Sequence, residues 1–310
     1  ILLIWFAIGI LLRFTALEVK SPWTDEFSTI VFSLGNSFRN VPLDQVISLD
    51  VLMQPIVPNP NASLADVTEH LLSESNHPPL YFLLAHLWMK WFPGDRFDLL
   101  WVARSFPAIL GAISIPAIYG LGYLAFRSRL IANLVAAMMA VSPYGIFLAQ
   151  EARHYTLAIL FVIASLCCLM TYVQRVQNEK LLPFWLSIIW IIVNSLGIAS
   201  HYFFVFALLA EAIVIIIFFW LNRNLTKSLY KSEFRKFIVT VIMGTIAGGI
   251  VWLPVLYHSY NSQLTEWIEN SDRIGFEWVS PIFQALAAWI TMLSLLPVEV
   301  TELPIVIASG

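Results

Sequence analysis

The stretch LIANLVAAMMAVSPYGIFLAQEARHYTLAILFVIASLCCLMTYV, residues 130–173, determines how this chain folds. Two apolar runs, 130–149 and 155–173, flank the polar residues 150–154. The hydrocarbon core of a bilayer is about 30 Å thick and takes roughly 20 apolar residues in a helix. Each run therefore predicts one membrane-spanning helix, and the polar residues predict a short connection at the membrane surface.

The rest of the chain repeats this pattern of long apolar runs and short polar connections. Of its 310 residues, 59% are hydrophobic and 12% are charged. Soluble domains have about 45–50% apolar and about 25% charged residues. The sequence therefore predicts an all-α, polytopic bundle of about seven to eight transmembrane helices. The candidate spans are 1–17, 100–126, 130–149, 155–173, 182–199, 202–221, 237–257 and the weaker 281–298.

Lysine and arginine residues predict the orientation, because they gather in the cytoplasmic loops of membrane proteins. Three alternate loops carry most of them: Arg127 and Arg129; Arg175 and Lys180; and Arg223, Lys227, Lys231, Arg235 and Lys236. We expect these loops on the cytoplasmic side of a plasma or inner membrane. The extracytoplasmic segments are then 18–99, 150–154, 200–201 and 258–280.

The long first outer segment is expected to contain helices that lie at the membrane surface. Ser63 can cap a helix that begins at Leu64, and the stretch 80–92 is too short to span comfortably. Residues 258–280 resemble another interfacial segment. No linker divides the chain, so we expect a single domain over residues 1–310, and a fragment that lacks C-terminal spans. The pair Gly244 and Gly248 favours close helix packing, with dimerisation as the weaker alternative.

The acidic pair Asp25 and Glu26 directly follows the first expected span on the outer side. A carboxylate there can act as a general base toward a hydroxyl, or it can bind a divalent cation. The plainer alternative is the first turn of a helix, where acidic residues are common.

Residues 150–155, Gln-Glu-Ala-Arg-His-Tyr, form the most distinctive polar cluster. On a helix Glu151 lies one turn from Tyr155, and the guanidinium of Arg153 suits a phosphate group. Arg153 could instead extend to the interface or pair with Glu151. We favour a functional role for this cluster, which includes His154, because anchoring does not need four adjacent polar side chains.

Single polar residues elsewhere give weaker signals. His77, before Pro78 and Pro79, and His201 with Tyr202 fall on the same outer face, and Arg104 lies near the outer end of its span. Each also fits a structural or interfacial role. Glu211 falls near the middle of a span, where an ionised carboxylate costs several kcal/mol, so we expect it to be neutral, paired or functional. No motif supports nucleic-acid binding.

Together these residues resemble the GT-C superfamily of polytopic glycosyltransferases, most closely the group of protein O-mannosyltransferases (family 39) and aminoarabinose transferases. The resemblance covers about residues 1–260 and rests on motifs in a fixed order. The matching elements are Asp25-Glu26, His77-Pro78-Pro79-Leu80, Arg104 with Ser105, Pro107 and Pro116, Ser142-Pro143, Gln150 to Tyr155, and His201-Tyr202.

The resemblance implies transfer of a sugar from a polyprenyl-phosphate donor to a protein, lipid or glycan acceptor on the extracytoplasmic face, with inversion. It makes Asp25 the general base, beside Glu26, and places Arg153 and Arg104 on the donor phosphate. The implied lining of the sugar or acceptor pocket is Glu26, His77, Glu151 and His154, with Tyr155, His201 and Tyr202 as further binding residues. It leaves a divalent metal open, and it names neither the sugar nor the acceptor.

Two other functions are compatible with the sequence. A transporter or lipid flippase needs ionisable residues at mid-membrane and broken helices. Glu211 and the prolines at 107, 116 and 143 fit that description, but most of the polar residues fall at the outer boundary. A non-catalytic scaffold that kept the fold is the second alternative.

Overall fold

The computed structural model describes residues 1–92, 98–221, 228–252, 257, 279, 280, 283 and 286. The chain divides into two compact units, residues 1–262 and 263–310, where the sequence predicts one domain. All helices named below belong to the first unit. The predicted interfacial segment 258–280 and the predicted span 281–298 lie almost entirely outside the described residues, as do Arg223 and Lys227.

The described residues form helices and no strand. In chain order the helices are α1 (Leu2–Phe14), α2 (Thr24–Ser33), α3 (Leu49–Met53), the 3-10 helix η1 (Gln54–Ile56), α4 (Leu64–Glu74), α5 (Leu80–Trp91), α6 (Leu99–Phe126), α7 (Arg129–Val141), α8 (Pro143–Ala149), α9 (Tyr155–Gln177), α10 (Phe184–Ser200), α11 (Phe204–Leu221) and α12 (Ser228–Ile250).

Three described helices, α6, α9 and α11, are long and apolar enough to cross a membrane. The bent pair α7 and α8 adds a fourth if it counts as one span. The chain is therefore an α-helical membrane protein with three to four such spans among its described residues, fewer than the seven to eight predicted. The apolar helices α1 and α10 have only 13 and 17 residues.

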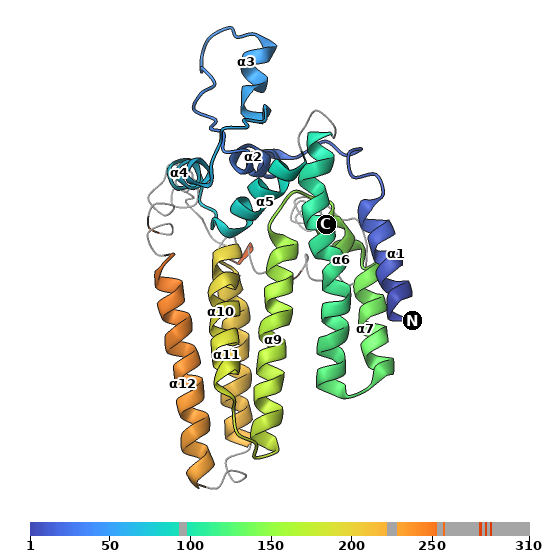
Figure 1. Cartoon of the computed structure of the whole chain (residues 1–310), viewed down its shortest axis with the longest axis vertical. Coiled ribbons are helices and arrows are strands. Elements are labelled where there is room, and N and C mark those ends of the chain that lie inside the picture. Colours follow the sequence, from blue (N-terminus) through green and yellow to red (C-terminus); the bar gives the residue numbers. More distant parts are fainter. Residues whose placement is uncertain are drawn as a thin grey trace. The chain divides into compact units, whose positions relative to one another are not determined.

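The long helices run side by side, and the short ones gather at one end of them (Figure 1). Helix α6 packs against α1, α7 and α9, and α10 packs against α9 and α12. Helices α2, α4 and α5 lie across one end, and α3 extends beyond them. The α6–α7 and α9–α10 connections lie at the other end (Figure 1). Two of the three basic loops therefore share one end of the first unit, as the sequence predicts.

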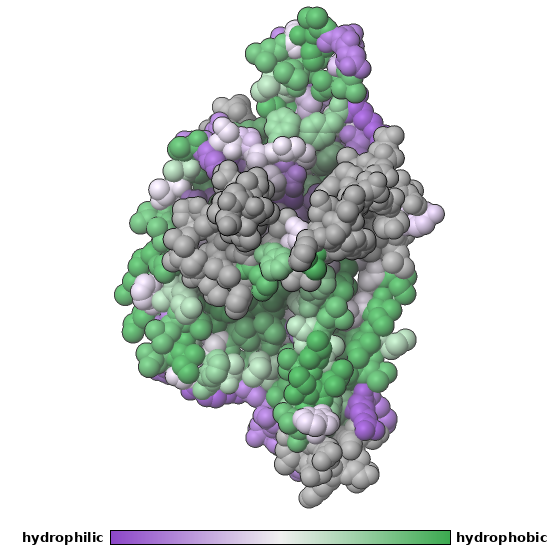
Figure 2. Space-filling view, turned by 180° about the vertical axis from the view of Figure 1, so that it is seen from behind, coloured by the Kyte–Doolittle hydropathy of each residue, from purple (hydrophilic) through white to green (hydrophobic). Residues whose placement is uncertain are grey.

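The long helices expose apolar side chains to their surroundings. Figure 2 shows a largely hydrophobic surface over the bundle, with hydrophilic residues at its lower end. Helix α11 buries only Phe204 and Glu211, while its other large side chains, Phe206, Leu209, Ile213, Ile216 and Trp220 among them, are exposed. Such a surface is stable in lipid, where apolar side chains need no protein cover.

The small helices at the end of the bundle begin where the sequence predicts. The Ser63 hydroxyl accepts a hydrogen bond from the Asp66 N–H, and the Asp66 carboxylate accepts one from the Ser63 N–H, so a capping box starts α4. Helix α5 spans Leu80–Trp91, close to the predicted 80–92. A buried cluster holds α2, α4 and α5 together: Phe32, Val67, Leu71, Tyr81, Phe82 and Ala85, with Leu157 of α9.

The predicted single span 130–149 is wrong, because it breaks at Ser142 into α7 and α8 with a bend of 57°. The Ser142 hydroxyl accepts a hydrogen bond from the Gly145 N–H at 3.1 Å and starts α8, with Pro143 in its first turn. Proline has no N–H for a continuous helix, and it suits a first turn. The apolar composition on both sides conceals this break in the sequence.

A buried arginine satisfies the carbonyl groups that the break exposes. The Arg13 side chain is fully buried and donates to the carbonyl oxygens of Ala140, at 3.0 Å, and Met139, at 2.8 Å. These are orphan carbonyls at the end of α7, where the helix dipole favours a cation. A Cβ atom at Gly111 would lie 3.1 Å from the Nε atom of Arg13, so glycine leaves room for the guanidinium. Arg13 thus stabilises the bend and does not extend to the interface.

Gly244 and Gly248 pack α12 closely against α10 within this chain. A Cβ atom at Gly244 would overlap the Ile191 side chain, and one at Gly248 would overlap that of Ser195. This contact confirms the expectation of close helix packing.

Candidate functional site

Four segments that are distant in the sequence meet at the end of the bundle where α2 and α5 lie. They are the first turn of α2, the residues before α5, the connection 150–154 between α8 and α9, and the end of α10. They bring together Asp25, His77, Arg153, His154 and His201. We call these five residues the polar cluster.

Arg153 is the centre of the polar cluster. Its side chain is 3% exposed. The Nη1 atom donates to the Asp25 carbonyl oxygen, at 2.9 Å, and to the Thr29 hydroxyl, at 2.8 Å. The Nη2 atom lies 3.4 Å from Asp25 Oδ2 and 3.2 Å from His77 Nε2. The guanidinium therefore joins α2 to the residues before α5.

Asp25 is the accessible acid of the pair that the sequence singles out. Its side chain is 48% exposed, although Arg153 beside it is buried. It lies in the first turn of α2, where the helix dipole favours a negative charge. The N-cap is Trp23, and its side chain makes no capping hydrogen bond, so Asp25 is not the cap. An ionised carboxylate held this way can accept a proton from a hydroxyl group.

Glu26 has a different environment from its neighbour. Both Glu26 and Arg104 are buried, and they form a two-pronged ion pair with N–O distances of 2.7 and 2.8 Å. Glu26 also accepts from the Ala152 N–H, and Arg104 donates to the carbonyl groups of Leu17 and Lys20. The predicted pocket residues Glu26 and Arg104 are therefore occupied by protein contacts, which hold α2 and α6 to residues 17–20 and 152.

Hydrogen bonds define the protonation of His77. A guanidinium nitrogen can only donate, so the His77 Nε2 atom accepts from Arg153 and carries no proton. The proton is on Nδ1, which lies 3.1 Å from the Ser75 hydroxyl. Burial, then the charge of Arg153, lower the pKa of His77 to about 4. His77 is therefore neutral at pH 7.

Three imidazole rings form a row beside Arg153. The ring of His154 lies 5.4 Å from that of His77 and 4.6 Å from that of His201, centroid to centroid. Burial is the main cause that lowers the pKa of His154 well below its usual value, and burial and Arg153 lower that of His201. The His201 Nδ1 atom accepts from the Phe203 N–H at 3.1 Å. The row is thus uncharged at neutral pH.

Several buried polar atoms around Arg153 have no hydrogen-bond partner among the described residues. They are Arg153 Nε, His154 Nδ1, the Tyr81 hydroxyl and the Thr156 hydroxyl. Buried polar atoms are normally paired, and unpaired ones are concentrated where a ligand or water binds. Burial raises the pKa of Tyr81, so this hydroxyl stays protonated and is available as a donor.

The other predicted residues lie around this cluster in different roles. Glu151 is buried and its carboxylate lies 3.1 Å from Lys20 Nζ. Tyr155 is half-buried, and its ring lies 5.6 Å from the Arg153 guanidinium carbon. Tyr202 lies in the turn between α10 and α11. Within the described ranges, no three His, Cys, Asp or Glu side chains are placed to hold a metal ion.

Sequence analysis did not single out Thr29, Ser75 or Tyr81. Thr29 follows Asp25 by four residues, and Tyr81 follows His77 by four, so both lie one helical turn from a predicted residue. That spacing was available in the sequence, but threonine and tyrosine are common on half-buried helices and gave no reason to select them.

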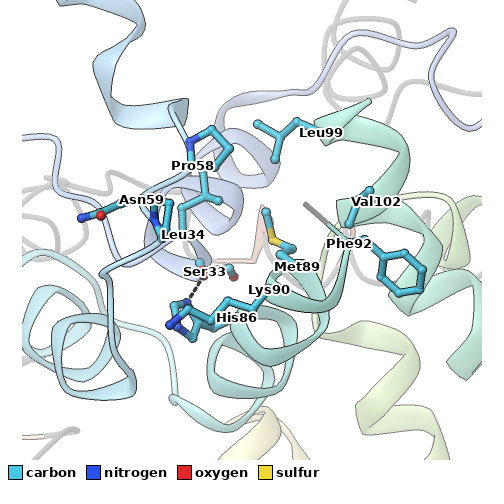
Figure 3. Close-up of a pocket in the computed structure, with 11 residues that line it drawn as sticks. Ser33, Leu34, Pro58, Asn59, His86, Met89, Lys90, Phe92, Leu99 and Val102 are labelled. Atoms are coloured by element: carbon cyan, nitrogen blue, oxygen red, sulfur yellow. Dashed lines mark hydrogen bonds between the residues drawn. The ribbon is translucent and has the colours of Figure 1, made fainter. Parts of the chain in front are cut away.

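A pocket of about 610 Å³ lies away from the polar cluster, at the C-terminal ends of α2 and α5 (Figure 3). Its walls include Leu34, Met89 and Val102, and the carbonyl oxygen of Ser33 accepts a hydrogen bond from His86 Nδ1 at 2.8 Å. Comparison of the chain with protein families, curated proteins and solved structures gives no match.

Proposed function

We propose that this protein is a membrane glycosyltransferase that moves a sugar from a polyprenyl-phosphate donor to an acceptor hydroxyl, with inversion at the anomeric carbon. The single observation that carries this proposal is the pair formed by the half-exposed Asp25 carboxylate and the buried Arg153 guanidinium, 3.4 Å apart. A base for the acceptor and a fixed cation for the leaving phosphate are the two groups that this reaction needs.

In this proposal Asp25 takes the proton of the acceptor hydroxyl as that oxygen attacks the anomeric carbon. Arg153 stabilises the charge that develops on the departing phosphate. Four of its N–H groups already have protein acceptors, so the phosphate binds to the unpaired Nε–H or replaces the His77 contact. His77, His154, Tyr155 and His201 line the same place.

The proposed topology keeps the seven to eight spans and the orientation that the sequence predicts. Helices α1, α6, α7 with α8, α9, α10, α11 and α12 would supply seven of these spans. The polar cluster lies at the end of the bundle opposite the α6–α7 and α9–α10 connections. If those basic connections face the cytoplasm, the cluster is extracytoplasmic and lies at headgroup depth, where a lipid-linked phosphate is found.

The test is sugar transfer by the full chain in detergent or proteoliposomes, with a panel of polyprenyl-phosphate sugars. Release of polyprenyl phosphate, read by mass spectrometry, identifies the donor. Asp25→Asn should abolish turnover while expression and donor binding are retained. Glu233→Gln, at an exposed ion pair with Lys236, is the control. Undiminished transfer by Asp25→Asn would exclude Asp25 as the base.

A transporter or flippase is the second candidate, and Glu211 is the observation that favours it. Its carboxylate is 5% exposed and bonds only to the Ser165 hydroxyl, at 2.9 Å, among the described residues. A reconstituted flippase would move labelled polyprenyl phosphate across vesicles without any sugar transfer. A glycosyltransferase would consume the donor without moving it.

A further inference from the structure

The inference below rests on the proposed function and concerns the three imidazole rings beside Arg153. In the proposed reaction the bond from the anomeric carbon to the donor phosphate breaks, and that carbon bonds to the acceptor oxygen. The electron pair of the broken bond remains on the phosphate, and Asp25 takes the hydroxyl proton. A phosphodiester with one negative charge becomes a phosphomonoester, which can carry two.

The polar cluster contains too little positive charge for a doubly charged phosphate. The titratable and charged groups that face His77 and His154 are Asp25 from α2, Tyr81 from α5, Arg153 and Tyr155 at the start of α9, and His201 at the end of α10. Arg153 and Asp25 cancel, and the nearby Glu26 is cancelled by Arg104. A bound dianion would leave two uncompensated negative charges in a largely buried place, which is costly.

The imidazole row can supply a positive charge. His77 Nε2 is unprotonated because it accepts from Arg153, and His154 Nδ1 is buried without a partner. An anion that takes the Arg153 hydrogen bond frees His77 Nε2 as a proton acceptor. Both causes that hold the pKa values of these rings down, burial and the charge of Arg153, are opposed by a neighbouring negative charge.

We propose that the imidazole row of His77, His154 and His201 takes up one proton when a phosphomonoester binds beside Arg153. The singly charged phosphodiester donor needs no such proton, because Arg153 alone matches it. The row would then distinguish the product phosphate from the donor by charge, and it would retain the product more tightly at lower pH.

The experiment compares two lipid anions with the same tail, farnesyl phosphate and farnesyl sulfate, on the full chain in detergent. The phosphate acquires a second charge with a pKa near 6, whereas the sulfate ester keeps a single charge. Calorimetry at pH 7.5 in buffers of different ionisation enthalpy counts the protons bound with each ligand. Phosphorus NMR of bound farnesyl phosphate reports the ionisation of the ligand itself.

We expect farnesyl phosphate to bind with uptake of close to one proton while the ligand stays doubly charged, and farnesyl sulfate to bind with none. The affinity for the phosphate should rise by up to about tenfold for each unit that the pH falls between 8 and 7. His77→Gln keeps an acceptor for Arg153 but cannot take a proton, so uptake should fall while sulfate binding remains. His154→Gln provides a second test, and His70→Gln, on α4, is the matched control.

Binding of farnesyl phosphate without proton uptake, or with the proton on the ligand, would overturn this inference and leave the proposed function standing. Uptake that persists in both His77→Gln and His154→Gln would also overturn it. Binding of neither anion would overturn the proposed function together with the inference.

Discussion

The guanidinium of Arg153 lies 3.4 Å from the carboxylate of Asp25, although 128 residues separate them in the chain. The contact is asymmetric, because the arginine is buried and the aspartate is half-exposed. A buried donor fixes the position of an acid that solvent and substrate can still reach. The arrangement suits a group that must exchange protons without moving.

Arg153→Lys should therefore reduce sugar transfer strongly while the protein still folds. Lysine keeps the charge, but it is a compact point charge that cannot contact Asp25, Thr29 and His77 together. Loss of one positioned donor to a developing negative charge costs about 10²–10³ in turnover. Initial rates at saturating donor measure this effect, and Arg175→Lys at the opposite end of α9 should leave them unchanged. Equal rates for the two variants would remove Arg153 from the mechanism.

Glu26→Gln should cost stability, in contrast to Asp25→Asn. Removal of one partner from a buried ion pair leaves the other charge uncompensated and costs about 3–5 kcal/mol. The unfolding midpoint in denaturant should fall clearly for Glu26→Gln and little for the half-exposed Asp25→Asn. If Glu26→Gln lost activity at full stability, its carboxylate would belong to the reaction after all.

Acid should destabilise the outer end of the bundle between about pH 6.5 and pH 4. The pKa of His77 is near 4 in the folded protein, below its usual value, so the unfolded chain binds more protons in this range. Stability from His77 is therefore complete above about pH 6.5 and is lost as the pH falls toward 4. Thermal unfolding as a function of pH measures this loss, and His77→Gln should flatten the profile. An unchanged profile in the variant would assign the acid sensitivity to other groups.

Gly248→Ala should weaken the contact between α10 and α12. The added Cβ would overlap the Ser195 side chain, and such overpacking typically costs about 1–3 kcal/mol. Gly120→Ala on α6 is a matched control, since its Cβ would meet nothing within 4 Å. The thermal midpoint should fall for the first variant and hold for the second. Equal midpoints would show that α12 can shift without cost.

Much of this arrangement could be predicted from local patterns in the sequence. Ser63 with Asp66 marks the start of α4, and Pro79 precedes α5, because capping and proline chemistry act over a few residues. The meeting of Asp25 and Arg153 could also be expected, since alternating spans bring outer connections to one surface. These features depend on short-range chemistry or on topology alone.

Other features depend on packing that no local pattern reveals. Adjacent carboxylates on a helix point in different directions, and only the fold decides that Glu26 faces Arg104 while Asp25 remains exposed. The break at Ser142 separates two apolar segments of the same composition, so hydropathy shows one span. Arg13 looked like an interfacial anchor because its carbonyl partners are 126 and 127 residues away.

The bend between α7 and α8 makes the geometry of the polar cluster depend on a residue that lies outside it. The connection 150–154 follows α8, so the direction of α8 determines where Arg153 begins its approach to Asp25. Arg13 stabilises that direction by covering the carbonyl groups at the end of α7. A straight helix would leave no such carbonyl groups exposed and no use for a cation at this depth. Arg13, the small residue at position 111 and the proline at 143 are thus expected to be inherited as a set, and replacement of any one of them alone would misdirect the site from a distance.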